Sequence, residues 1–259
     1  MGAHSDLIVD ARPDLNRFFK ATAMQISYFV YFLDQSNSGR RIDDRDLARL
    51  TDMLSRVPGM SEGLVFTPLQ NEIAHPFSDD GAPPVLALQL RLSLEALEAA
   101  AGLDGALQAL ARPGALPSLE GCDVTHQAMM TRRFPVDDPV NRSSGDPSCS
   151  YLVHYPGVAE DLNAWLRHYV AHHPAIMRTF PGVRQIEVYT RVDWIDALPW
   201  RRVNYMQRNK LVFDSPSALS AALLSPVIHD MRADFHRFPP FTGSNIHFPM
   251  TTRVVAPAS

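Results

Sequence analysis

The sequence predicts an α+β protein made of two fused units, each ordered β-α-β-β-α-β and packed sheet to sheet as one intramolecular α/β barrel. Three observations support this prediction. Short patterns recur in the same order about 120 residues apart. The hydrophobic periodicity of each repeat gives strands and helices in the ferredoxin-like order. The two helices of such a unit cover one face of its sheet, so the other face needs a partner, which a second fused unit supplies.

The internal repeat is clearest in the pattern H-x-x-M-x-T-R, which begins at His126 and again at His247. Four pairs of patterns in one order at a near-constant offset indicate one duplicated unit. The other three pairs begin at Tyr28 and Tyr151, at Val57 and Phe180, and at Ser93 and Ser215. The resulting boundaries are an N-terminal arm at 1–20, a first unit at 21–136, a linker at 137–148 and a second unit at 149–259.

The elements of the first unit follow from its periodicity. Leucines at helical spacing precede Pro58-Gly59, which ends the helix. The run from Val85 alternates as a half-buried strand does, and Ser93 after it can cap a helix. The expected elements are strands at 24–33, 62–68, 85–92 and 123–136, and helices at 43–60 and 93–102.

The second unit repeats this order. A long segment carries Trp165 and Tyr169 and is followed by Gly182, a residue favoured just past a helix end. Asp214 and Ser215 can cap a later helix. The expected elements are strands at 149–155, 185–190, 203–213 and 244–255, and helices at 159–180 and from about residue 216.

Composition and charge exclude several classes of protein. The 259 residues include 24 Lys and Arg against 28 Asp and Glu, a net charge of −4, so we expect no nucleic-acid partner. No apolar run reaches the ~18 residues of a membrane span, and the start lacks the apolar core of a signal peptide, so we expect a cytoplasmic protein. Cys122 and Cys149 stand in no metal-binding pattern and no glycine-rich phosphate loop is present, so we expect no metal and no cofactor.

Three segments of the second unit resemble the EthD family. Segment 169–183 carries an aromatic residue, two histidines and a proline, and then Phe-Pro-Gly. Segment 213–226 and the pair Asp234-Phe235 resemble the family's second helix, so the match spans 149–255. The resemblance implies the dimeric α/β-barrel superfamily, which holds cofactor-free monooxygenases, isomerases, lyases, decarboxylases and haem enzymes. The fold therefore does not specify the reaction.

The first unit departs from the family pattern. Arg49 and Leu50 stand at the positions that align with His172 and His173. The resemblance therefore implies one working site, in the second unit, while the first unit completes the barrel.

The candidate site residues are those that suit acid–base chemistry near neutral pH. We expect His172 to move a proton and Tyr169, on the same helix face, to donate to a developing oxyanion. His154, in the first strand of the second unit, is a third catalytic candidate. Packing against the protein core is the competing interpretation for each. The residues expected to bind substrate are His173, Arg178, His247, Arg253, Trp194 and Trp200.

The function expected from these observations is a cofactor-independent lyase, isomerase or decarboxylase acting on a small oxygenated molecule of aromatic or polyketide-like character. Two alternatives stay open: a non-catalytic small-molecule-binding accessory protein and a cofactor-free monooxygenase. The expected partner is a small-molecule substrate, and two barrels could pair as a homodimer. Oxygen consumption with substrate separates the monooxygenase from the other enzymes.

Overall fold

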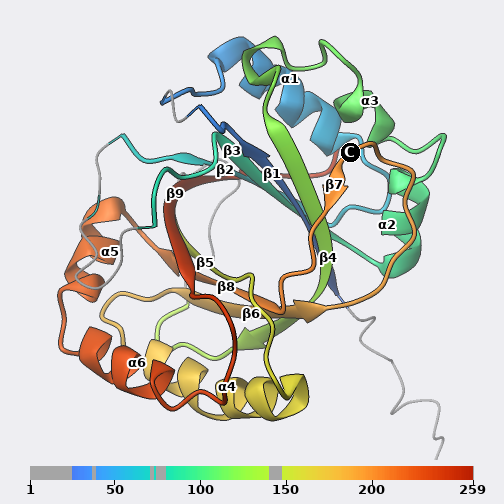
Figure 1. Cartoon of the computed structure of the whole chain (residues 1–259). Helices are drawn as coiled ribbons and strands as arrows, with labels where there is room; N and C mark the ends of the chain where they lie inside the picture. Colours follow the sequence, from blue (N-terminus) through green and yellow to red (C-terminus); the bar gives the residue numbers. More distant parts are fainter. Residues whose placement is uncertain (1–24, 37–38, 71–72, 74–79, 140–147, 259) are drawn as a thin grey trace, which may run out of the picture.

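The computed structural model describes residues 25–36, 39–70, 73, 80–139 and 148–258. Its barrel consists of eight strands: β1 (Ile26–Leu33), β2 (Glu62–Pro68), β3 (Leu86–Leu92), β4 (Asp123–Phe134), β5 (Ser148–Tyr155), β6 (Gln185–Arg191), β8 (Gln207–Phe213) and β9 (Ile246–Val255). They are antiparallel and follow the order β1-β3-β2-β9-β5-β8-β6-β4, and β4 returns to β1 to close the barrel (Figure 1). A short strand, β7 (Arg201–Arg202), pairs in parallel with the start of β4.

Two long strands join the first half of the chain, residues 25–139, to the second half, residues 148–258. Strand β4 pairs with β1 through residues 123–130 and with β6 through residues 129–134. Strand β9 in the same way pairs first with β5 and then with β2. The strand order is therefore β4-β1-β3-β2 in the first half and β9-β5-β8-β6 in the second. Closure leaves none of the eight strands as an unpaired edge.

Six α-helices of the described residues lie outside the barrel: α1 (Asp44–Ser55), α2 (Leu94–Ala101), α3 (Gln108–Ala111), α4 (Leu162–Met177), α5 (Pro216–Leu223) and α6 (Val227–Phe235). The first three lie beside the strands of the first half and the last three beside those of the second (Figure 1). Asp43, Ser93, Asp161 and Ser215 cap four of these helices by accepting from the backbone N–H three residues on.

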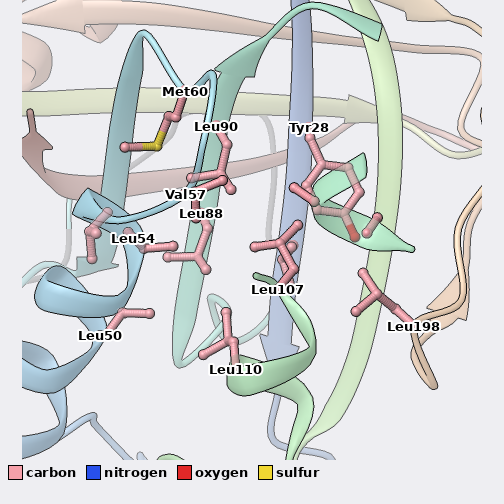
Figure 2. Close-up of a cluster of buried hydrophobic side chains, with 14 of the residues drawn as sticks. Tyr28, Leu50, Leu54, Val57, Met60, Leu88, Leu90, Leu107, Leu110 and Leu198 are labelled. Carbon is pink, nitrogen blue, oxygen red and sulfur yellow. The ribbon is translucent and has the colours of Figure 1, made fainter. Parts of the chain in front are cut away.

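Each half has its own apolar core between helices and barrel wall. In the first half, Leu50 and Leu54 of α1 pack in one cluster with Leu88 and Leu90 of β3 (Figure 2). A similar cluster in the second half joins α4, α5 and α6 to the outer face of β5, β6 and β8. Alternate strand residues point the other way, into the barrel, as the twofold period of a strand requires.

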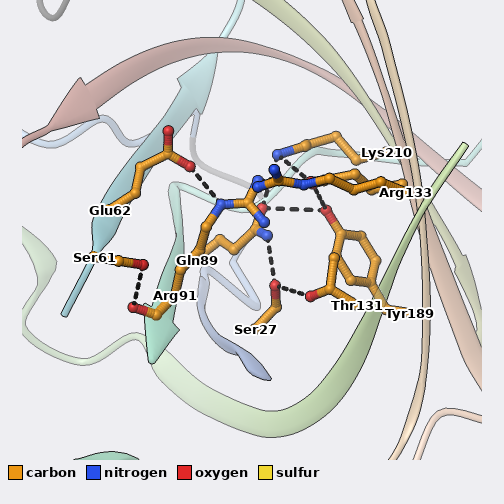
Figure 3. A network of polar contacts seen from close by, with 10 residues as sticks. Ser27, Ser61, Glu62, Gln89, Arg91, Thr131, Arg133, Tyr189 and Lys210 are labelled. Atoms are coloured by element: carbon orange, nitrogen blue, oxygen red, sulfur yellow. Dashed lines mark hydrogen bonds and ion pairs between the residues drawn. The ribbon is translucent and has the colours of Figure 1, made fainter. Parts of the chain in front are cut away.

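The barrel interior is partly apolar and partly ionic. Phe29, Phe66 and Met129 belong to its apolar cluster. Beside them, Glu187 of β6 forms ion pairs with Arg91 of β3 and with Lys210 of β8, and the pair with Arg91 links the two halves. Gln89, Ser27, Thr131 and Tyr189 complete the network of hydrogen bonds (Figure 3). The interior is therefore a packed and cross-linked core.

Residues 192–202, which connect β6 towards β8, cross to the first half; we call them the crossing segment. Its Leu198 is buried in the core of the first half (Figure 2). The backbone N–H of Ala197 donates to the carbonyl of Ala101 at 2.9 Å. The rings of Trp194 and Trp200 each meet His126 edge-on, with centroids 5.9 Å apart. The crossing segment thus covers the part of the first-half outer face around His126 with residues from the second half.

The structure confirms an α+β chain folded as a closed barrel walled by helices. The helix expected at 43–60 is shorter in the structure, because α1 ends at Ser55. The residues after it form a turn that includes Gly59, whose φ of +74° favours glycine. The helix expected from about residue 216 is two, α5 and α6, separated at Pro226. Asp214 pairs with Arg184 instead of capping α5. The predicted arm at 1–20 and linker residues 140–147 lie outside the described residues.

Candidate functional site

A cavity of about 100 Å³ lies between the outer face of the second-half strands and helices α4, α5 and α6. Engineered cavities of on the order of 150 Å³ hold a benzene molecule, so this space is on the scale of a small aromatic ring. Its wall is mainly apolar, with a few polar groups. The polar lining residues are Tyr151, Tyr155, His173, Asn209, Arg232, Asn245 and His247.

The periodicity of three elements brings these side chains together. Tyr151 and Tyr155 lie four residues apart on the outward face of β5, and Asn209 follows the same alternation on the neighbouring β8. His173 and Met177 are one turn apart on α4 and share its inner face. The site therefore combines side chains from β5, β8 and α4.

His173 is paired with Asp234 of α6. Its Nδ1 donates to Oδ2 of Asp234 at 2.7 Å, and His168 Nε2 lies 3.3 Å from the other carboxylate oxygen. Nε2 of His173 has no hydrogen-bond partner among the described residues, and the ring lines the cavity. Burial lowers the pKa of His173, against the opposing effect of Asp234, so the imidazole is neutral near pH 7. Its Nε2 is then able to accept a proton.

The Asp234 carboxylate stays charged beside this histidine. Burial alone would raise its pKa, but the hydrogen bonds and electrostatic interactions with His173 and His168 together outweigh burial and lower it. A carboxylate that accepts from Nδ1 fixes the tautomer of the ring and stabilises the imidazolium that forms when Nε2 takes a proton.

Two tyrosines continue the polar wall. Tyr169 of α4 is fully buried, and its hydroxyl accepts a hydrogen bond from Asn209 Nδ2. Tyr155 lines the cavity, with its ring edge-on to Tyr169 at 5.6 Å and to Trp165 at 5.1 Å. Burial raises the pKa of both hydroxyls, so both remain protonated at neutral pH.

The first half contributes a carboxylate to the surroundings of this cavity. Asp80, which precedes β3, accepts from Nδ1 of His247 at 2.8 Å. Nε2 of the same ring lies 3.1 Å from the amide nitrogen of Asn245, and the ring stacks on Tyr151 at 5.3 Å. A second imidazole–carboxylate pair thus lies at the cavity wall and spans both halves.

The three residues expected to be catalytic lie in different places. His172 is on the exposed side of α4, where its Nδ1 donates to the carbonyl of His168 at 2.9 Å. Tyr169 lies next to the cavity-lining Tyr155 and His173 but does not line the cavity itself. His154 points into the barrel, where its Nδ1 accepts from Arg208 at 2.9 Å. The structure does not bring these three side chains together.

Of the residues expected to bind substrate, His173 and His247 line the cavity. Arg178 is exposed and pairs with Asp137, and Arg253 is an exposed residue of β9. Trp194 and Trp200 of the crossing segment cover the first half instead of the cavity.

Sequence reasoning did not select several cavity residues. Tyr155 follows His154 in β5, so strand alternation sends the two side chains to opposite faces, and only one of them was selected. Asp234 was noted only as part of a helix pattern. Asn209, Asn245 and Asp80 carry no signal in their local sequence, because their roles arise from strand pairing.

Cofactor and membrane signals were sought in the described part of the chain. No group of three or more His, Cys, Asp or Glu side chains there is placed to hold a metal ion. Nor does any helix there have the length and apolar character needed to cross a membrane.

No family model and no curated protein matches the sequence. Among solved structures, an anthrone oxidase-like protein superposes with a TM-score of 0.59 at 12% identity, over 92% of this chain and 98% of that one. A chlorite dismutase from Candidatus Nitrospira defluvii gives a TM-score of 0.46 at 11% identity, over 92% of this chain and 94% of that one. An EthD family protein from Bacillus halodurans gives a TM-score of 0.30 at 20% identity, over 38% of this chain and 95% of that one.

These similarities concern the fold. The chain shares a barrel fold with the anthrone oxidase-like protein, and its closed eight-stranded α/β barrel agrees with the fold expected from the sequence. At such low identity a shared fold does not transfer an activity, because members of one fold carry out unrelated reactions.

Proposed function

We propose that the chain is an enzyme that carries out acid–base chemistry on a small oxygenated aromatic molecule, with His173 as the general base. The observation that carries this proposal is the neutral, buried imidazole whose Nδ1 donates to Asp234 at 2.7 Å while the ring lines the cavity. A base held in this way takes a proton at Nε2, and the adjacent carboxylate stabilises the resulting cation. The apolar walls suit a flat, weakly polar substrate.

The proton transfer fits the reactions expected from the sequence. An isomerase or lyase removes a proton next to a carbonyl, and the electron pair moves to the carbonyl oxygen as an enolate. A decarboxylase returns a proton to the carbanion left when carbon dioxide departs. One acid–base group in a dry cavity serves each of these steps.

A cofactor-free monooxygenase is the second candidate, and the fold similarity to an anthrone oxidase-like protein favours it. Here the carbanion formed by His173 would react with molecular oxygen. A methylene group of the substrate becomes a carbonyl, and the second oxygen atom leaves as water. The same base therefore starts both types of reaction, and the fate of the anion distinguishes them.

We also infer that the halves are duplicated units, near residues 21–136 and 149–259, with one working cavity. The Tyr151–His247 ring pair of the second half has a counterpart in Tyr28–His126, where the hydroxyl lies 2.6 Å from Nδ1. In the first half, side chains of the crossing segment lie against that pair. The repeated strand order and this repeated pair of side chains both support the duplication.

The test is a screen of oxygenated aromatic compounds, beginning with single-ring phenols that match the cavity volume, with product analysis and an oxygen electrode. For any substrate found, His173→Gln should lower kcat by roughly 10²- to 10⁴-fold, the usual contribution of a general base. Asp234→Asn should lower it less, because the base remains. His172→Gln is the matched control on the exposed face of the same helix and should retain full activity. Full activity of His173→Gln, or tight binding without turnover, would refute the proposal.

A further inference from the structure

Tyr155 is the cavity residue whose position is most tightly constrained. It is the last residue of β5, only 1% of it is exposed, and it lines the second-half cavity. Aromatic rings surround it on several sides. Their centroids lie 5.1 to 6.3 Å from its own, and they belong to Trp165, Tyr169, Phe238 and Phe241. A ring held in this way keeps its hydroxyl in one place, which is the condition for a preorganised donor.

Polar side chains surround the Tyr155 hydroxyl. Asn209 Nδ2 donates to the hydroxyl of Tyr169, and Tyr169 in turn contacts the hydroxyl of Tyr155. The Asn245 amide also acts on the Tyr155 oxygen, and both contacts lower the pKa of Tyr155, as donors to a phenol oxygen do. Burial has the larger, opposite effect, so the hydroxyl keeps its proton. None of the hydrogen bonds within the described residues uses that proton.

We propose that Tyr155 is a second catalytic residue, whose hydroxyl donates a hydrogen bond to the substrate oxygen that becomes negative when His173 removes a proton. The proton moves from the substrate to Nε2 of His173, the electron pair moves to the substrate oxygen, and Tyr155 keeps its own proton. This inference rests on the proposed function and narrows the substrate class to phenols and to carbonyl compounds that form enolates. A substrate without such an oxygen would leave a buried donor unpaired.

Three other polar side chains at or beside the cavity are less suited to this role. Tyr169 does not line the cavity, and its hydroxyl already bonds Asn209. His247 is held by Asp80 and faces the Asn245 amide. Arg232 is an exposed residue at the cavity wall. Among these side chains, Tyr155 alone combines a fixed ring, a retained proton and a place on the cavity surface.

The experiment uses 4-nitrophenol as the probe, since its absorption reports whether the bound phenol is ionised. The full chain and its variants Tyr155→Phe and His173→Gln are titrated with the probe at fixed pH. In the unmodified protein, the bound probe should ionise more readily than the free one. Loss of one hydrogen bond to a charged oxygen should weaken phenolate binding by roughly tenfold to a hundredfold in Tyr155→Phe. Nitrobenzene, which has no hydroxyl, should bind the unmodified protein and Tyr155→Phe with equal affinity.

The controls separate this inference from the proposed function. Tyr28→Phe removes a buried tyrosine hydroxyl of the first half, far from this cavity, and should leave phenolate binding unchanged. Thermal denaturation verifies that each variant folds. If His173→Gln lowers the ionised fraction but Tyr155→Phe binds phenolate as tightly as the unmodified chain, the role of Tyr155 is wrong and the proposed function stands. If His173→Gln leaves the ionised fraction unchanged, the proposed function itself fails.

Discussion

The substitution Glu187→Gln tests whether ion pairs inside the barrel hold its two halves together. The Glu187 side chain is 0% exposed; its carboxylate lies 2.8 Å from Arg91 Nη2 and 3.1 Å from Lys210 Nζ and accepts from the Tyr189 hydroxyl at 2.6 Å. Glutamine keeps the shape of the side chain but removes its charge. Lys210, itself buried, would then face only neutral oxygens, among them that of Gln89, 3.0 Å away. The substitution therefore leaves buried cations without their central anion.

The expected cost follows from this burial. Removing one partner of a buried ion pair costs about 3–5 kcal/mol, because the remaining charge is stranded in a medium of low dielectric constant. For a chain of this size, ~1 kcal/mol corresponds to ~2–4 °C in Tm, so Glu187→Gln should lower Tm by roughly 6–20 °C. Arg133 is the matched control, since its Nε contacts the same carboxylate at 3.0 Å while its side chain is 58% exposed. Arg133→Gln should cost less than ~1 kcal/mol.

Thermal and urea denaturation, followed by circular dichroism, measure both variants. The double variant Glu187→Gln/Lys210→Met removes the stranded cation and should be more stable than Glu187→Gln alone. The reasoning is refuted if Glu187→Gln costs no more than Arg133→Gln, or if the two changes in the double variant destabilise additively.

Two further predictions concern pH and the crossing segment. Burial lowers the pKa of Lys210 from its ordinary 10.5 to about 8, against the opposing charge of Glu187, so the folded chain binds fewer protons than the unfolded chain between these values. Stability should therefore rise by roughly 1 kcal/mol from pH 8 to 9.5, and Lys210→Met should abolish the rise; a fall in this window would contradict the assignment. Leu198→Ala should cost about 2–5 kcal/mol because Leu198 is buried in the first-half core, whereas the 74% exposed Ile195→Ala should change stability by less than ~0.5 kcal/mol in the same denaturation assay. Equal effects of the two would show that the segment does not pack as described.

The strands were the most predictable part of the fold. The alternation from Val85 gave the position of β3 to within one residue, because a strand with distinct faces places a different kind of residue at every second position. Helix ends were less predictable. The leucine spacing continues past Ser55, and only the turn at Gly59 stops α1. The path of the crossing segment had no periodic signal at all.

The choice between the adjacent histidines of α4 shows what a single sequence can and cannot give. Trp165, Tyr169, His173 and Met177 are spaced by four and form one buried face of the helix. This spacing favours His173, whereas His172 lies about 100° around the helix and is exposed. The signal for the helix face was therefore present in the sequence. The partner Asp234 was not predictable, because it reaches His173 only through the packing of α6 on α4.

The difference between the two halves explains why similar patterns need not give two sites. Both halves place a tyrosine and a histidine on the outer face of their sheets, at positions about 120 residues apart. In the second half this pair borders a cavity, and in the first it is covered by Trp194 and Trp200. The covering residues come from the other half and lie far from His126 in the sequence. In the first half, therefore, the path of the crossing segment covers the pair, so a repeated tyrosine–histidine pair does not by itself imply a repeated cavity.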